Sequence, residues 1–178
     1  MDIKIGSKVT LTKDELEECK EVAFTRHGVM MSVDSTVNNL AIDKEPSKQI
    51  TVDHPLTLEE LSVRGQTAFC ILAGSEPDRS VHPRSSQNNT EKPHTILPNG
   101  LSVTIRVTRK KTNRLVVEPH KKQVGDLYAL MIGDGDTYEF RGFKKQKELL
   151  QDKYLKNIGW GLLYAADQCE LVDLKDLK

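Results

Sequence analysis

The feature that most constrains the fold is the stretch Leu101–Thr108, in which apolar and polar residues alternate without a break. Successive side chains of a β-strand point to opposite sides of a sheet, so the pattern predicts a strand with one apolar and one polar face. The residues on the polar face are Ser102, Thr104, Arg106 and Thr108. The chain therefore contains a sheet whose one side is built to face a core.

Four further strands are predicted, at 114–118, 127–132, 137–141 and 162–165. The run Leu127–Ile132 is apolar throughout, which is typical of a central strand buried on both faces. Asp134-Gly135-Asp136 has the composition of a tight turn and predicts a hairpin between the second and third of these strands. We expect the first four strands to pair as a meander in sequence order.

Helices are predicted on both sides of this strand region. Capping boxes at Thr12–Glu15 and Thr57–Glu60 predict two helix starts, with ends near Arg26 before Gly28 and at Gly74. Gly65 inside the second helix costs about 1 kcal/mol relative to alanine, and either close approach of another element or sequence drift accounts for it. A third helix is expected over 144–155, and a short strand at 50–52.

These elements predict one α/β (α+β) domain over residues 1–178. It has two N-terminal helices, a central mixed sheet of about four to five strands and one C-terminal helix. Residues 75–96 are rich in Ser, Pro, Asn and His without periodicity, and we expect a long mobile loop there. Residues 29–48 show no clear pattern.

Composition restricts the class of protein. The chain has 26 basic and 26 acidic residues, so its net charge is zero and it is not globally attractive to nucleic acid. Three widely spaced cysteines predict neither a disulfide framework nor a zinc site, and two of them are expected to be buried thiols. Without an apolar signal segment or an 18-residue apolar run, we expect a cytoplasmic protein that makes no membrane contact.

Basic residues concentrate between the alternating strand and the apolar run. The seven predicted nucleic-acid-binding residues are Arg106, Arg109, Lys110, Lys111, Arg114, Lys121 and Lys122. If the flanking strands pair, Arg109–Arg114 forms a positively charged loop tip that would attract a phosphate backbone. The alternative is a solvated turn balanced by acids near Asp134 and Asp173. A second basic cluster contains Lys144, Lys145 and Lys147.

Other chemistries lack their motifs in this sequence. Asp134, Asp136 and Glu139 do not complete a calcium loop and fit a hairpin turn better. The five histidines have no metal-ligand spacing and are expected at the surface. No Walker loop, dinucleotide fingerprint or nucleophile elbow is present. The sequence predicts no metal site and no cofactor.

The order of the motifs resembles the PD-(D/E)XK nuclease-like proteins of tailed phages. The segments that carry this resemblance are Leu11–Glu15, Gly65–Ala68, Ile105–Thr108, Asp126–Leu130 and Tyr138–Phe143. They span most of the chain, although each motif is short. The resemblance implies a phage protein with a nuclease-like fold.

The same resemblance identifies the positions that a nuclease would need. Such a site holds Mg²⁺ with carboxylates and uses a lysine near the attacking water. The matching positions are Gln66, Thr104 and Arg106, none of which is a carboxylate, and arginine is no base at neutral pH. Asp78 or Glu91 are the candidates for relocated ligands.

Three functions remain open from the sequence. The preferred one is a non-catalytic, degenerate nuclease-like phage protein that binds nucleic acid, or a host protein, in the host cytoplasm. The second is an active Mg²⁺-dependent DNA nuclease with relocated carboxylates. The third is a phage inhibitor or structural protein that binds a host or virion protein.

Overall fold

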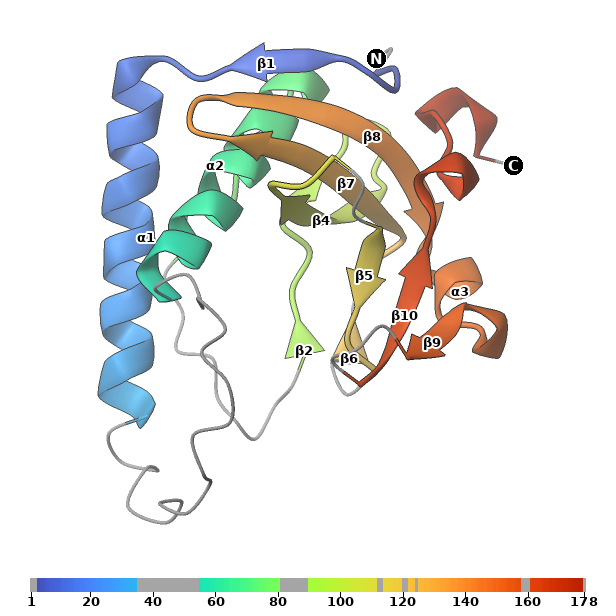
Figure 1. The fold of residues 1–178 in the computed structure, drawn as a ribbon. Helices are drawn as coiled ribbons and strands as arrows, with labels where there is room; N and C mark the ends of the chain where they lie inside the picture. The colour runs from blue at the N-terminus through green and yellow to red at the C-terminus, as the bar shows by residue number, and fades with distance from the viewer. Residues whose placement is uncertain are drawn as a thin grey trace.

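A five-stranded mixed sheet lies between a layer of two helices and a second, smaller sheet (Figure 1). The computed structural model describes residues 3–34, 55–80, 90–111, 114–119, 122–123, 125–157 and 161–177. Within these ranges the helices are α1 (Lys13–Asp34), α2 (Pro55–Ala73) and α3 (Gln146–Leu149). The strands are β1 (Lys8–Thr10), β2 (Thr90–Glu91), β3 (Thr95–Ile96), β4 (Ser102–Thr108), β5 (Leu115–Val117), β6 (Lys122–Gln123), β7 (Leu127–Asp134), β8 (Thr137–Lys145), β9 (Leu155–Asn157) and β10 (Leu162–Ala166).

The large sheet has the strand order β1-β8-β7-β4-β3. Its one parallel pair is β4 with β7, and β8 returns from β7 as an antiparallel hairpin partner. The small sheet has the order β5-β10-β9 and is antiparallel. A two-residue parallel pair joins β2 to β6. The predicted fold class, α/β (α+β) with two N-terminal helices and a central mixed sheet of about four to five strands, is confirmed.

Strand β7 supplies both cores of the molecule. Its first six residues, Leu127–Ile132, are all buried, as the apolar run predicts. Ala129 and Met131 pack with the helices, whereas Tyr128, Leu130 and Ile132 pack with the small sheet. The sheet is therefore covered on both faces.

The parallel pairing of β4 and β7 corrects the expected meander. Strand β5 does not return beside β4 but crosses to the small sheet, where it pairs with β10. Leu115 and Val117 are buried there in the second core. The alternation in the sequence identifies the strands and their buried faces, but it holds no information on which strand lies beside which.

The two N-terminal helices begin and end partly as predicted. The Thr12 amide donates to the Glu15 carboxylate at 2.7 Å, which confirms the first capping box. Helix α1 nevertheless continues through Gly28 to Asp34, and α2 begins at Pro55, so Thr57 lies inside that helix rather than at its cap. Helix α2 ends before Gly74 as expected.

Gly65 lies where α2 approaches β4 most closely. A Cβ atom at this position would come within 2.5 Å of both methyl carbons of Val107. Two atoms cannot approach that closely without displacement. The close-approach explanation for this glycine is therefore confirmed, and it sets the distance between the helix layer and the sheet.

A β-bulge in β8 changes which residues face which core. Leu130 pairs with Gly142 but Met131 pairs with Phe140, which leaves Arg141 as the extra residue. Gly142 has a φ of +121°, a conformation that favours glycine. Because of the bulge, Phe140 and Phe143 both enter the helix-side core although they are three residues apart.

The C-terminal part departs most from the prediction. The expected helix over 144–155 is one short turn, α3, followed by a 3-10 turn at Asp152–Tyr154 and by β9. Strand β8 extends through Lys145 and takes up the residues assigned to the helix start. Two more 3-10 turns, Gln168–Glu170 and Leu174–Asp176, follow β10.

The expected loop at 75–96 is partly ordered into strands. Thr90–Glu91 and Thr95–Ile96 form β2 and β3, and β3 pairs with β4 at the edge of the large sheet. The predicted strand at 50–52 lies outside the described residues. So do most of the weakly patterned segment 29–48 and residues 81–89.

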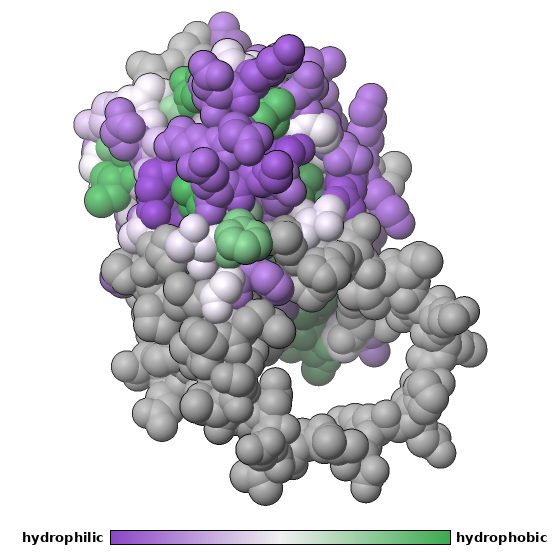
Figure 2. Space-filling model, turned by 90° about the vertical axis from the view of Figure 1, so that its left-hand side faces the viewer, coloured by the Kyte–Doolittle hydropathy of each residue, from purple (hydrophilic) through white to green (hydrophobic). Residues whose placement is uncertain are grey.

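The outer face of α1 is predominantly hydrophilic (Figure 2). Among the α1 side chains that the structure describes, 13–28, Phe24 is a large apolar residue that is exposed, to 67%. No described helix combines the length and apolar character needed to cross a membrane.

The close approach at Gly65 generates a stability prediction. Gly65→Ala should lower the free energy of unfolding by about 1–3 kcal/mol, because the new methyl group displaces the stiff Val107 side chain. Adding Val107→Ala should relieve the overlap and recover part of the loss. Chemical denaturation followed by circular dichroism measures all three proteins.

Gly28→Ala is the matched control. Gly28 also lies inside a helix, but a Cβ atom there meets no atom within 4 Å. This substitution should raise stability by up to about 1 kcal/mol. Equal effects of the two alanines would show that the contact with Val107 does not matter.

Candidate nucleic-acid interface

The three positions matched to nuclease ligands do not meet in the structure. Gln66 lies on α2, on the helix side of the large sheet, and is 6% exposed. Its amide donates to the Ser62 hydroxyl at 2.9 Å. Thr104 and Arg106 pair with Tyr128 and Leu130, whose side chains pack into the core on the opposite side of the sheet.

Thr104 is buried rather than presented to solvent. Its exposed fraction is 1%, and a Cβ atom on Gly125 would lie 3.4 Å from its hydroxyl oxygen. The polar face of β4 therefore faces the space between the two sheets at this position. Within the described ranges, no group of three or more His, Cys, Asp or Glu residues could hold a metal ion.

The predicted basic residues occupy three kinds of surroundings. Arg106 is half-buried on β4. Arg109, just after β4, forms an ion pair with Asp134 at 3.4 Å. Lys110 and Lys111 are exposed in the connection from β4 to β5. Lys121 lies outside the described residues, and only the backbone of Lys122, in β6, is described.

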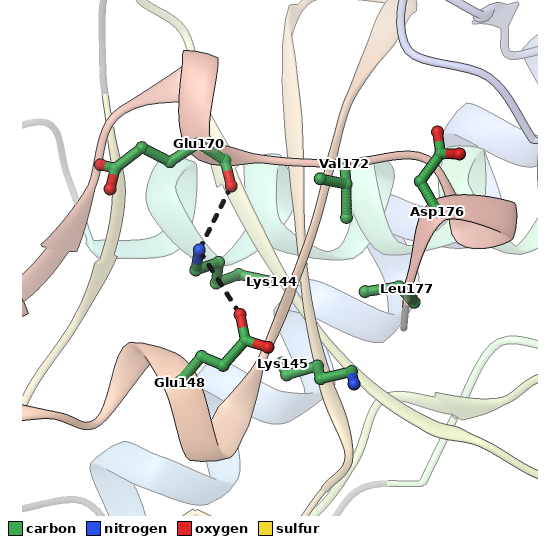
Figure 3. A pocket seen from close by; sticks show the side chains of 7 residues that line it. All are labelled: Lys144, Lys145, Glu148, Glu170, Val172, Asp176 and Leu177. Atoms are coloured by element: carbon green, nitrogen blue, oxygen red, sulfur yellow. Dashed lines mark hydrogen bonds and ion pairs between the residues drawn. The ribbon is translucent and has the colours of Figure 1, made fainter.

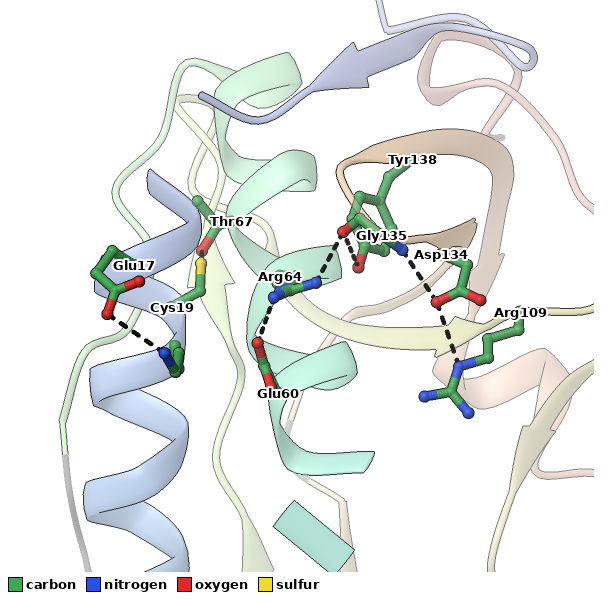
Figure 4. Close-up of polar contacts among 10 residues, drawn as sticks. Glu17, Cys19, Glu60, Arg64, Thr67, Arg109, Asp134, Gly135 and Tyr138 are labelled. Carbon is green, nitrogen blue, oxygen red and sulfur yellow. Dashed lines mark hydrogen bonds and ion pairs between the residues drawn. The ribbon is translucent and has the colours of Figure 1, made fainter. Parts of the chain in front are cut away.

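Arg109 closes one side of a hollow at the tip of the β7–β8 hairpin (Figure 4). Arg64, from α2, donates to the Gly135 carbonyl at 3.0 Å and forms an ion pair with Glu60. Burial of the Tyr138 ring beside them raises the pKa of its hydroxyl to about 12. The bond from Arg64 to Gly135 fixes the hairpin to α2, and the ion pair between Arg109 and Asp134 fixes it to the end of β4. Each arginine here therefore already has a carboxylate partner within the fold.

Arg114 belongs to a second set of ion pairs. Asp167, which follows β10, pairs with Arg114 and lies 3.6 Å from the Lys156 amine. The hydrogen bond from Arg114 lowers the pKa of the Asp167 carboxyl, so this acid is ionised at neutral pH. One carboxylate, just after the central strand β10, thus holds two cations, from the residue before β5 and from β9.

The structure adds Arg141 and Lys156 to the predicted basic residues. The bulge in β8 places Arg141 on the side of the second core, where its Nε donates to the Gln168 side chain at 2.9 Å. Gln168 in turn donates to the Lys111 carbonyl at 2.6 Å. These contacts join residues from four elements into what we call the basic surface: Lys110, Lys111, Arg114, Arg141 and Lys156.

The sequence did not predict Arg141 and Lys156 as binding residues, because neither has a basic residue directly beside it. Arg141 follows Glu139-Phe140, and its placement depends on the bulge. Gly142 directly after it was the available signal, because an isolated glycine inside a strand pattern often marks a bulge.

Lys144, one residue of the second basic cluster, is used within the fold. Lys144 lies between two oxygens, the Glu170 carbonyl at 3.3 Å and the Glu148 carboxylate at 3.5 Å (Figure 3). Burial by itself would lower the pKa of Lys144, but the adjacent Tyr154 and Glu148 raise it above its ordinary value. This amine lines a hollow of about 150 Å³ and links β8 to the C-terminal segment.

The burial of Thr104 can be tested by introducing the carboxylate that the nuclease pattern would place there. Thr104→Glu should lower stability by about 3 kcal/mol or more at pH 7, because it puts an uncompensated charge between two packed layers. The loss should shrink as the pH falls toward about 4, where the carboxyl is neutral in both states. Denaturation at the two pH values measures it.

Thr108→Glu provides the control on the same face of β4. Thr108 is half-exposed near the basic surface, so its replacement should change stability by less than about 1 kcal/mol. A well-tolerated Thr104→Glu would mean that this face is open to solvent.

Comparisons with protein-family models, with curated proteins and with solved structures found no match to this chain. The resemblance to PD-(D/E)XK nuclease-like proteins therefore stays a prediction, and no family is assigned.

Proposed function

We propose that the protein is a non-catalytic nucleic-acid-binding protein that contacts the phosphate backbone with its basic surface. The observation that carries the proposal is the state of Lys110 and Lys111. Both are exposed, and no described carboxylate forms an ion pair with either of them. Their charges are available to a ligand from outside the molecule.

The neighbours of the two lysines add to this positive charge. The basic surface contributes five positive charges, and its described ion pairs involve two carboxylates, Asp167 and Glu139. An excess of about three positive charges attracts phosphates and releases condensed counterions. A local excess of this kind is compatible with a chain whose total charge is zero.

The non-catalytic part of the proposal has separate support. The position that would carry a metal-binding carboxylate is the buried Thr104. Gln66 lies across the sheet from it. The proposal places this protein in the host cytoplasm, as a phage product. The exposed, unpaired thiol of Cys169 is compatible with a reducing compartment.

Salt dependence of binding tests the role of the lysines. The double substitution Lys110→Ala, Lys111→Ala should weaken binding to duplex DNA. It should also reduce the slope of log K against log salt by about two, since about 0.9 counterion is released per phosphate contact. Fluorescence anisotropy at several salt concentrations gives both quantities.

The control removes two exposed lysines elsewhere, of which Lys20 pairs with Glu17 at 3.5 Å. Lys20 is on α1 and Lys175 is in the last 3-10 turn, and Lys20→Ala with Lys175→Ala changes the net charge by the same amount. This variant should keep the wild-type slope. The proposed interface is wrong if both double variants lose the same affinity, or if wild-type protein binds neither DNA nor RNA.

A cleavage assay tests the non-catalytic part. Supercoiled plasmid incubated with the protein and Mg²⁺ or Mn²⁺ should remain intact, because the strand face that would hold the metal ligands is buried. Chelator-sensitive nicking that copurifies with the protein, and is lost in Asp78→Ala or Glu91→Ala, would instead support the relocated-carboxylate nuclease.

A further inference from the structure

Gln168 joins two parts of the basic surface that come from distant points in the sequence. Its Nε2 donates to the Lys111 carbonyl at 2.6 Å, and its Oε1 accepts from Arg141 Nε at 2.9 Å. The first hydrogen bond fixes the backbone at Lys111, in the connection between β4 and β5 that carries Lys110 and Lys111. The second fixes the guanidinium of Arg141 at the bulge of β8.

The turn that carries Gln168 is itself firmly held. Asp167 and Glu170 form a capping box around the 3-10 turn, with the Asp167 amide donating to Glu170 at 2.9 Å. Just beyond it, Val172 and Phe143 exchange two backbone hydrogen bonds, of 2.8 and 3.0 Å. Gln168 therefore projects from a segment anchored on β8, and it can impose a position on the longer connection between β4 and β5.

An amide suits this task better than a charged side chain would. It offers a donor and an acceptor at once, so it can hold a carbonyl and a guanidinium without cancelling positive charge. The adjacent Asp167 also joins two cations, Arg114 and Lys156, but it neutralises one charge in doing so. Affinity rises when binding groups are held in place before the ligand arrives, because less ordering remains to be done.

We infer that Gln168 is a positioning residue of the basic surface, which holds Lys110, Lys111 and Arg141 in one array for adjacent backbone phosphates. This inference rests on the proposed function. It assigns a role in nucleic-acid binding to a neutral side chain in the C-terminal 3-10 turn, which makes no phosphate contact of its own in this scheme.

A double-mutant cycle tests the role in binding. Gln168→Met keeps the size and charge of the side chain and removes both hydrogen bonds, so it should weaken DNA binding about three- to tenfold. In the Lys110→Ala, Lys111→Ala background the same substitution should cost less than about twofold, because most of the residues it positions are gone. Equal losses in the two backgrounds would overturn the inference while leaving the proposed function intact.

Hydrogen exchange in the free protein tests, without any ligand, whether the hydrogen bond from Gln168 to the Lys111 carbonyl acts as a tether for residues 109–111. Gln168→Met should speed amide exchange in residues 109–111 and leave the buried strand β7 unchanged. Unchanged exchange in residues 109–111 would overturn the positioning role even if DNA binding fell. If the tether is found but wild-type protein binds no nucleic acid, the proposed function fails, and the role inferred for Gln168 in binding fails with it.

Gln151→Met is the matched control for both measurements. Gln151 is exposed and donates to the Lys147 carbonyl at 3.3 Å, so its replacement also removes one contact from a glutamine amide to a backbone carbonyl. This contact lies in the α3 region, outside the basic surface. The control should alter neither the affinity for DNA nor exchange in residues 109–111.

Discussion

The burial of β7 on both faces is the constraint on which the rest of the structure depends. A strand with six consecutive buried side chains needs a partner strand on each edge and a covering layer on each side. Strands β4 and β8 supply the edges, α2 supplies one cover with α1 packed behind it, and the small sheet supplies the other. This requirement accounts for the path of the chain. The segment after β4 leaves the large sheet and forms β5 of the small sheet, and β7 then pairs with β4.

Much of this fold could be predicted from local patterns. The alternation in β4, the apolar run of β7, the Asp134–Asp136 turn and the first capping box each depend on a few adjacent residues, and each is found where the sequence places it. Strand partners are different, because they depend on which faces can be covered. The sequence of β5 is equally suited to lie beside β4 or in a second sheet, so the meander was wrong. The expected C-terminal helix failed for a related reason, since its first residues complete the pairing of β8 with β7.

The candidate interface was only partly visible in the sequence. The run Arg109–Lys111 predicts a charged connection, and the structure exposes two of its lysines. The sequence could not reveal that Arg109 is paired with Asp134, or that Arg141 and Lys156 join the same surface, because those contacts join residues that are distant in the sequence. The nuclease-like positions illustrate the same limit. Their spacing on β4 is correct for one shared face, yet the small sheet covers that face at Thr104.

The pairing of β1 with β8 has a consequence for how the chain is made. Lys8–Thr10 precedes its partner residues, Thr137–Glu139, by well over 100 residues; Thr10 and Thr137 are 127 positions apart. On the ribosome β1 therefore has no edge to join until β8 has been synthesised. The β7–β8 hairpin, in contrast, closes across two residues and can form as soon as it emerges. Strand β1 is thus translated well before its partner, and it can find its place only after β8 has formed.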